Sequence, residues 1–208
     1  MADGQTAPPF RKLAQAAPDI EVTRKPDGTV YLRARQAPGD RPRTIGHALD
    51  ERASDHPDRP FLKQRDPETD AWQAITYGDA KATTDRLAQA LIDLGAGPDA
   101  PVMILSGNSI AHAMMMLAAQ KIGAPAAPIS VPYSTMSSDF AKLRHCFDAV
   151  KPKVIFAEQF APFQPALDAL PLNGVEVIAR EGAGNTVHAY DTLAATPVTP
   201  AVAEAMDR

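Results

Sequence analysis

The sequence predicts an α/β fold in which the strands of a parallel sheet alternate with helices. Apolar runs of strand length recur at 102–105, 126–131, 154–156 and 175–178, and segments with helical spacing of apolar residues separate them. A strand, a helix and a second strand joined this closely favour a parallel pair with a right-handed crossover. The chain has 208 residues, of which 45% are hydrophobic, and can therefore bury the core of one large domain or of part of one.

The first residues are predicted to lie outside this core. Residues 1–18 are rich in Ala, Pro and Gln and have little periodicity, so we expect a mobile N-terminal arm. Residues 19–43 are assigned to a β-hairpin and a linker. Strands at 20–23 and 29–32 flank the turn Lys25-Pro26-Asp27-Gly28, in which proline presets a backbone dihedral and glycine tolerates positive φ.

Two helices and a second hairpin are predicted to open the main domain. Thr44 is an N-cap for the first helix, which ends at His56-Pro57 because proline disfavours helical geometry in the residue before it. Strands at 60–65 and 71–75 form the hairpin. Thr76 caps the second helix. The buried stripe of that helix is predicted to contain Leu87, Ala88, Leu91 and Leu94.

The following segment alternates between strand and helix. The strand at 102–105 leads directly into a helix, because Ser106-Gly107-Asn108-Ser109 supplies turn residues and an N-cap. Gly123 and Pro125 end that helix before the strand at 126–131. Ser137-Ser138 can cap a further helix. The apolar face of this helix contains Phe140, Leu143, Phe147 and Val150.

The periodic pattern ends near Arg180. The main domain is therefore assigned to 44–180, with a short helix at 160–170 before its last strand. Residues 181–208 are rich in Gly, Ala, Thr and Pro, and we predict a connector there instead of an element that closes the domain.

Composition and charge exclude several classes of function. The formal net charge is -4 and the Lys and Arg residues are scattered, so no nucleic-acid partner is expected. A single cysteine excludes an internal disulfide framework and a cysteine-cluster zinc site. No apolar run approaches the roughly 20 residues that span a bilayer, and the first residues lack the apolar core of a signal peptide. We expect a cytoplasmic protein without a membrane partner.

Few residues have the spacing that a reactive or ligand-binding site requires. The amides near Ser106-Gly107-Asn108-Ser109 could bind an anion, but the segment lacks the glycine fingerprint and the lysine of a P-loop, so turning and capping are favoured. His112 has no Asp, Glu, Cys or second His at ligand spacing, which favours a surface role over a metal site. No catalytic or metal-binding residue is assigned, and no cofactor-binding residue is identified.

Three other groups have simple structural interpretations. His145 and Cys146 are adjacent, so their side chains diverge by about 100° on a helix and do not meet at one reacting atom. Met114-Met115-Met116 covers most of the circumference of a helix, which indicates burial on several sides. Three charged residues are expected on a solvated face, or at contacts between domains in a longer protein: Asp139, Lys142 and Arg144.

Part of the chain resembles a known enzyme family. The segment ILSGNS, the alanine-rich helix after it, and the segments GAPAAPISVPYS and DFAKLRH are similar to feruloyl-CoA synthases and their relatives, which are adenylate-forming acyl-CoA synthetases. The segment IGHALDERASDHPDRPFLKQRD and the pair Thr76-Tyr77 resemble the entry region of these ligases. The resemblance covers residues 20–156 and implies a partial AMP-binding-type domain. This part would be the first βαβ-type layered subdomain of the large N-terminal domain, incomplete and preceded by a β-hairpin.

The resemblance implies the N-terminal portion of an ATP-dependent acyl-CoA ligase. The whole enzyme would activate a carboxylic acid of the hydroxycinnamate class with ATP, release pyrophosphate and transfer the acyl group to coenzyme A, while Mg²⁺ offsets the phosphate charge. The phosphate-binding loop of the family is rich in Gly, Ser and Thr and ends in lysine, and it has no counterpart in these 208 residues. We therefore expect this chain alone to bind none of these cofactors and to be inactive.

Two other functions are compatible with the sequence. One is a non-catalytic module that binds an anion or nucleotide through the amides near Ser106 and Ser109. The other is a subunit of a split ligase, which would bury an open sheet edge against a separately encoded C-terminal portion. Calorimetric titration with ATP, AMP and coenzyme A tests the first function, and co-purification of a stoichiometric partner tests the second.

Overall fold

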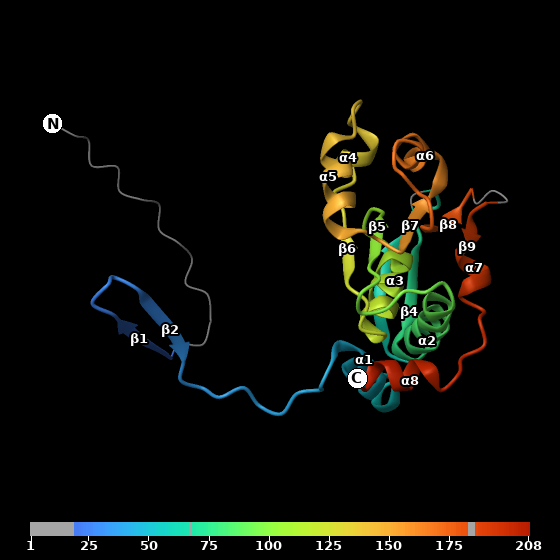
Figure 1. Cartoon of the computed structure of the whole chain (residues 1–208). Helices are drawn as coiled ribbons and strands as arrows, with labels where there is room; N and C mark the ends of the chain where they lie inside the picture. Colours follow the sequence, from blue (N-terminus) through green and yellow to red (C-terminus); the bar gives the residue numbers. More distant parts are fainter. Residues whose placement is uncertain (1–18, 67, 183–185) are drawn as a thin grey trace. The chain divides into compact units, whose positions relative to one another are not determined.

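The computed structural model describes residues 19–66, 68–182 and 186–208. The chain divides into two compact units between Arg41 and Pro42. The N-terminal arm predicted at 1–18 lies outside the described residues. The α/β prediction is confirmed, since the second unit contains a parallel sheet with helices on both of its faces (Figure 1).

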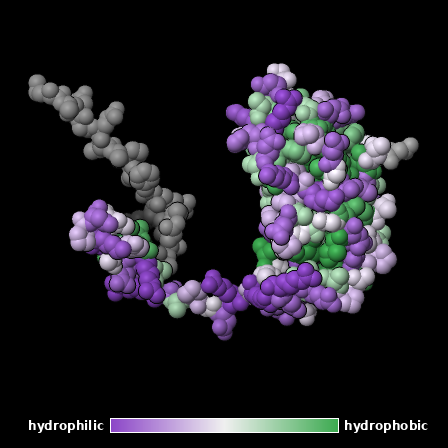
Figure 2. Space-filling model, in the orientation of Figure 1, coloured by the Kyte–Doolittle hydropathy of each residue, from purple (hydrophilic) through white to green (hydrophobic). Residues whose placement is uncertain are grey.

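The first unit contains the predicted hairpin. Strand β1 (Ile20–Arg24) pairs antiparallel with β2 (Val30–Ala34), and Gly28 in the turn has a φ of 86°. That backbone conformation favours glycine because a side chain would be strained there. The register places Val22 opposite Leu32, so the apolar side chains share one face of the hairpin. All ten strand residues are exposed, and apolar residues are visible on the hairpin surface (Figure 2).

The second unit is built around five parallel strands in the order β6-β5-β7-β8-β9. These strands are β5 (Val102–Leu105), β6 (Ala126–Pro128), β7 (Val154–Gln159), β8 (Glu176–Glu181) and β9 (His188–Ala189). Because β5 lies between β6 and β7, the chain leaves β5 toward one side of the sheet and later returns across it (Figure 1). This reversal is a topological switch point between β5 and β7.

Helices cover both faces of this sheet. On one face, α2 (Tyr77–Asp93) and α3 (Ile110–Lys121) pack in a core that includes Ile104 and Phe156. On the other face, α5 (Ala141–Val150) and α6 (Phe160–Asp168) pack in a core that includes Leu105 and Ile155. Successive residues of β5 and β7 therefore enter two different cores, as the two-residue period of a strand requires.

Three predicted N-caps are confirmed. Thr44 precedes α1 (Ile45–Asp55), Thr76 precedes α2 and Ser109 precedes α3. In each case the side-chain hydroxyl accepts a hydrogen bond from the backbone N–H three residues later, at 3.3, 3.1 and 3.0 Å respectively. Between α1 and α2, strands β3 (Pro60–Arg65) and β4 (Trp72–Thr76) form the predicted antiparallel hairpin.

The prediction that 181–208 form only a connector is wrong. Strand β8 extends to Glu181, β9 pairs with it, and two short helices follow, α7 (Tyr190–Leu193) and α8 (Ala201–Met206). Elements this short have no detectable periodicity, so tertiary contacts stabilise them. The buried Gln89 of α2 accepts hydrogen bonds from the backbone N–H and the hydroxyl of Thr199, at 3.0 and 2.7 Å.

Two boundaries between β6 and α5 also differ from the prediction. The strand expected at 126–131 ends at Pro128, and a short helix, α4 (Pro132–Thr135), follows it. The Ser137 hydroxyl accepts from the N–H of Phe140, and Phe140, with a φ of 53°, then precedes α5. A left-handed residue therefore separates the serines from the helix that they were predicted to cap.

In the described part of the chain, no helix is long and apolar enough to cross a membrane.

The contact between β8 and β9 is expected to weaken in acid. Glu176 accepts a hydrogen bond from His188 Nε2 at 2.9 Å, and this bond and the nearby Lys153 charge hold the pKa of the Glu176 carboxyl below its ordinary value of 4.5. A lowered folded-state pKa stabilises the protein above the unfolded pKa, and this contribution is lost as pH falls through the folded pKa. Both side chains are more than one-third exposed, so the contribution should stay below about 1 kcal/mol.

Thermal unfolding between neutral pH and about pH 3 tests this contact. The substitution Glu176→Gln should lower the midpoint near neutral pH, and the difference from wild type should shrink in acid. Glu51→Gln, on the exposed face of α1, is the matched control. A constant difference across the pH range would contradict the assigned role of Glu176.

Candidate functional site

The candidate site lies at the carboxyl ends of β5, β7 and β8. Parallel strands bring these ends to one edge of the sheet. From this edge α3 leaves β5 toward one face, and α6 leaves β7 toward the other. The loops after β5 and β7 therefore diverge at the switch point, which is the part of an open parallel sheet where ligands commonly bind.

A row of three polar side chains crosses this edge. Ser106 follows β5, Glu158 lies near the end of β7, and Arg180 lies near the end of β8. The Ser106 hydroxyl donates to Glu158 Oε2 at 3.0 Å, and Arg180 Nη1 lies 3.5 Å from Glu158 Oε1. Ser106 is buried, and the Glu158 side chain is 15% exposed. Both carboxylate oxygens therefore have partners, and this row of contacts joins the ends of the three strands.

The loop between β5 and α3 is held by contacts with its own helix and with β3. His112 Nδ1 lies 2.9 Å from the Gly107 carbonyl oxygen, which can only accept, so this nitrogen carries a proton and donates. Ser109 accepts from the His112 N–H, and Gln64 Oε1 accepts from the Ile110 N–H at 2.8 Å. Two of the first amides of α3 therefore already have partners. Turning and capping explain the segment 106–109.

Two cavities flank this loop. One of about 670 Å³ lies between β3 and α3, with Leu62 and Met116 among its apolar walls and Lys63 at its rim. The other, of about 460 Å³, lies over the loops that follow β5 and β6. Both are lined by Asn108 and His112, and both have the size of small-molecule sites.

The other residues singled out in the sequence do not form a reactive centre. Met114 and Met115 are fully buried and Met116 is partly buried, which confirms their packing role. No hydrogen bond or ion pair joins His145 to Cys146 in the described residues, and Cys146 packs at the edge of the second core. No group of three His, Cys, Asp or Glu residues in the described ranges could hold a metal ion.

The three charged residues near α5 make local contacts. Asp139 accepts from the Ala141 N–H at 3.1 Å, and the Lys142 ammonium lies 5.3 Å from the centre of the Tyr133 ring. Arg144 Nε donates to the Ala169 carbonyl at 3.3 Å. These contacts fit the solvated face that the sequence predicted.

Glu158 and Arg180 were not predicted as site residues from the sequence. Each lies directly after the buried part of a predicted strand, where the carboxyl end of a parallel strand meets the ligand edge. This position after a predicted strand was the feature of the sequence that could have identified them. The pairing of Leu105 with Ala157 then places the next residues, Ser106 and Glu158, side by side.

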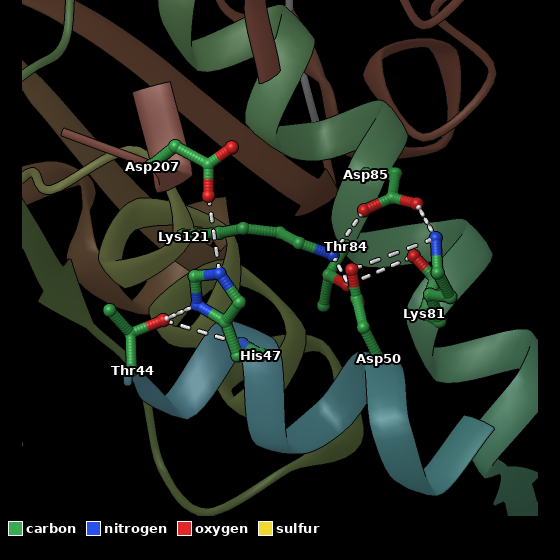
Figure 3. Close-up of polar contacts among 8 residues, drawn as sticks. All are labelled: Thr44, His47, Asp50, Lys81, Thr84, Asp85, Lys121 and Asp207. Carbon is green, nitrogen blue, oxygen red and sulfur yellow. Dashed lines mark hydrogen bonds and ion pairs between the residues drawn. The ribbon is translucent and has the colours of Figure 1, made fainter. Parts of the chain in front are cut away.

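A second polar cluster lies among α1, α2 and α3 (Figure 3). The ammonium of Lys121, which is 2% exposed, is 2.7 Å from Asp50 Oδ1 and also pairs with Asp85. Lys81 lies 2.6 Å from Asp85 and 3.9 Å from Asp50. Burial lowers the pKa of Lys81, but the hydrogen bond to Asp85 and the charges of both carboxylates together raise it above its ordinary value. The four charges cancel, so the cluster joins helices and offers no reactive group.

Removal of the Ser109 cap should destabilise the fold by about 1 kcal/mol. The substitution Ser109→Ala leaves the His112 N–H at the start of α3 without its hydroxyl acceptor. Ser138→Ala is the matched control, because Ser138 is exposed and its hydroxyl makes no hydrogen bond to another described residue. Urea unfolding should show a lower midpoint for Ser109→Ala alone, and equal midpoints would contradict the capping role.

A family model described as AMP-binding enzyme matches residues 49–206. The chain is 31% identical over 154 residues to long-chain fatty acid transport protein 2 of Rattus norvegicus, which covers 73% of this chain and 23% of that protein. It is 36% identical over 115 residues to the medium/long-chain-fatty-acid–CoA ligase FadD6 of Mycobacterium tuberculosis, which covers 55% of this chain and 17% of the ligase. The chain therefore spans less than a quarter of the length of either relative.

Solved structures show the same fold. Acetoacetyl-CoA synthetase from Streptomyces lividans matches with a TM-score of 0.64 at 19% identity, over 76% of this chain and 26% of that one. A fatty acyl CoA synthetase of Mycobacterium tuberculosis matches with a TM-score of 0.57 at 25% identity, over 74% of this chain and 28% of that one.

Proposed function

Because the chain belongs to the family of AMP-binding enzymes, we propose that it is the N-terminal part of an adenylate-forming acyl-CoA ligase. The observation that carries this proposal is the family match over residues 49–206, which includes the whole parallel sheet and its switch point. The full ligase would form an acyl-adenylate and then an acyl-CoA thioester. In that enzyme this chain would contribute the carboxyl edge of the sheet, where Glu158 contacts Ser106 and Arg180.

The start of α3 is an unfavourable place for the phosphates of ATP. Two of the first amides of α3 are capped by Ser109 and Gln64, and the carboxylate of Glu158 lies at the same edge. A polyphosphate needs free amides and cations, and a nearby carboxylate repels it. We therefore propose that ATP, Mg²⁺ and coenzyme A are held by residues of the ligase outside this chain, and that these 208 residues alone are inactive.

The proposed substrate class is an aromatic carboxylic acid such as a hydroxycinnamate. It rests on the resemblance of ILSGNS and GAPAAPISVPYS to feruloyl-CoA synthases. Two relatives carry names that point to fatty acids, and a fatty acid is therefore the competing class. The comparison of ferulate with a medium-chain fatty acid as substrates of the full ligase separates the two.

We expect no pyrophosphate release when the purified chain is incubated with ATP, Mg²⁺ and ferulate. The DNA that follows the codon for Arg208 is first sequenced in all three reading frames. The matched control is the same polypeptide extended by the sequence that this DNA encodes. An extension to the full length of a ligase that includes a Gly/Ser/Thr-rich loop ending in lysine should release pyrophosphate with its own acid. Pyrophosphate release by the 208 residues alone would contradict the proposed inactivity.

A split ligase is the second candidate. In the described part of the sheet, the outer strands β6 and β9 each pair with one neighbour, so each has an edge available for another strand. A separately encoded C-terminal portion could cover such an edge. Co-purification of one stoichiometric partner with adenylating activity would support this candidate, and a monodisperse monomer from the native source would oppose it.

A further inference from the structure

One buried hydroxyl group lacks a hydrogen-bond partner. Among the described residues, Ser134 Oγ is the single buried side-chain oxygen or nitrogen without one. Ser134 is 3% exposed and lies in α4, which contacts α5 and α6 (Figure 1). A buried hydroxyl of this kind has lost its hydrogen bonds to water and gained none in the protein. The observed packing of α4 is therefore unfavourable at this residue.

The segment around α4 has few polar contacts with the rest of the second unit. We call residues 130–139 the strap. Every hydrogen bond that the described structure gives to the strap has its partner within the strap or in the two residues that follow it. The last main-chain bond to the sheet comes just before the strap, where the Ile129 N–H donates to the Ile104 carbonyl at 2.9 Å. Apolar contacts of Val131 and Tyr133 with the second core therefore hold the strap in place.

The residue that follows the strap is unfavourable as well. Phe140 has a φ of 53°, a left-handed backbone conformation in which a bulky side chain is strained. Local unfolding of the strap would relieve this strain and would also return the Ser134 hydroxyl to water. Segments that open before the rest of a protein typically combine few main-chain ties with such locally unfavourable residues.

The strap also forms part of a cavity wall at the ligand edge of the sheet. Ser130, Val131 and Pro132 line the cavity of about 460 Å³, and the buried Ser106 lines it from the loop after β5. The start of α3 is held by its own contacts with Gln64 and Ser109. Movement of the strap would therefore widen this cavity while the other side of its lining stays in place.

We propose that the strap is a gate that opens by local unfolding while the parallel sheet stays folded. In the closed state the Ser134 hydroxyl is buried without a partner, and in the open state it binds water. This difference keeps the two states close in free energy and makes opening frequent. Opening widens the cavity and gives access to Ser106. The gate is a property of this chain alone and does not depend on the proposed ligase function.

Amide hydrogen exchange of the 208-residue chain, followed by mass spectrometry, tests the gate. Peptides from the strap should be protected relative to an unfolded peptide, but should exchange about 10- to 100-fold faster than peptides from β5 and β7. Low concentrations of urea should accelerate exchange in the two strands more than in the strap. Global unfolding exposes much more surface than local opening and therefore responds more steeply to urea.

The substitution Ser134→Ala tests the role of the unpaired hydroxyl. It removes the unfavourable group from the closed state and should slow exchange in the strap about 5-fold. Ser138→Ala is the matched control, because Ser138 is an exposed serine of the same strap, and it should exchange like wild type. Circular dichroism shows whether each variant is folded.

Thiol labelling tests access to the cavity. Cys146 is the single cysteine of the chain, so Cys146→Ala removes the native thiol and Ser106→Cys then places one at the cavity wall. A soluble thiol reagent should label this position without global unfolding, and addition of Ser134→Ala should slow the labelling about 5-fold. Addition of Ser138→Ala should leave the labelling rate unchanged.

Three results would overturn the proposal. The first is exchange in the strap that matches β5 and β7 in rate and in urea dependence, which would show that the strap opens only on global unfolding. The second is exchange in the strap at the rate of an unfolded peptide, which would show that it has no closed state. The third is unchanged exchange and unchanged Ser106→Cys labelling in folded Ser134→Ala, which would show that the buried hydroxyl does not control the strap.

Discussion

Replacement of Lys121 by methionine should lower the free energy of unfolding by about 3 kcal/mol. The Lys121 ammonium is 2% exposed and joins Asp50 of α1 to Asp85 of α2 (Figure 3). Without it, two carboxylates that are 27% and 16% exposed would face each other with Lys81 as their remaining partner. Removal of one partner from a buried charge cluster is costly because it leaves the other charges uncompensated.

Urea unfolding followed by circular dichroism measures this loss. Lys142→Met is the matched control, because Lys142 lies at the surface of α5. The free energy of unfolding of this variant should stay within about 0.5 kcal/mol of that of wild type. Conversion of Asp50 and Asp85 to Asn in the Lys121→Met background should restore part of the stability, since no unpaired carboxylate remains. A Lys121→Met variant as stable as Lys142→Met would show that the cluster contributes little.

Apart from α4 and the boundaries beside it, the elements before Arg180 could be predicted because their signals are local. Thr44, Thr76 and Ser109 lie where a hydroxyl caps the following helix, and apolar residues recur at the helical period within α2 and α3. The elements after Arg180 depend on distant residues. Thr199 is held by Gln89, which is 110 positions earlier in the chain, and no sequence window contains both residues.

The same distinction applies to the polar residues. The loop that contains Ser106 could be predicted from its turn residues, but its contact with Glu158 depends on the register of β5 and β7. Lys121 occupies the last turn of α3, where a cation is common at the surface. Its burial follows from Asp50 and Asp85, which are 71 and 36 positions away. Spacing in the sequence cannot reveal such a partnership.

Truncation of Phe156 to alanine should destabilise the second unit by about 3–5 kcal/mol. Phe156 is fully buried in β7, and the sheet register places it between Ile104 of β5 and Ile178 of β8. Loss of the ring would leave a cavity that these neighbours can fill only in part, because main-chain hydrogen bonds fix their strands. Phe156→Leu retains most of the volume and should cost less than half as much.

Chemical unfolding tests this expectation, with Trp72→Ala as the control. Trp72 is an aromatic residue that is 66% exposed, so its replacement should change the free energy of unfolding by no more than about 0.5 kcal/mol. Because the Phe156 ring also contacts Tyr190, its loss should increase amide hydrogen exchange in α7 before the sheet unfolds. An effect confined to α7, with an unchanged unfolding midpoint, would show that Phe156 supports only that helix. A large loss of stability together with faster exchange in α7 would show that one residue stabilises both the sheet and the short helix that follows it.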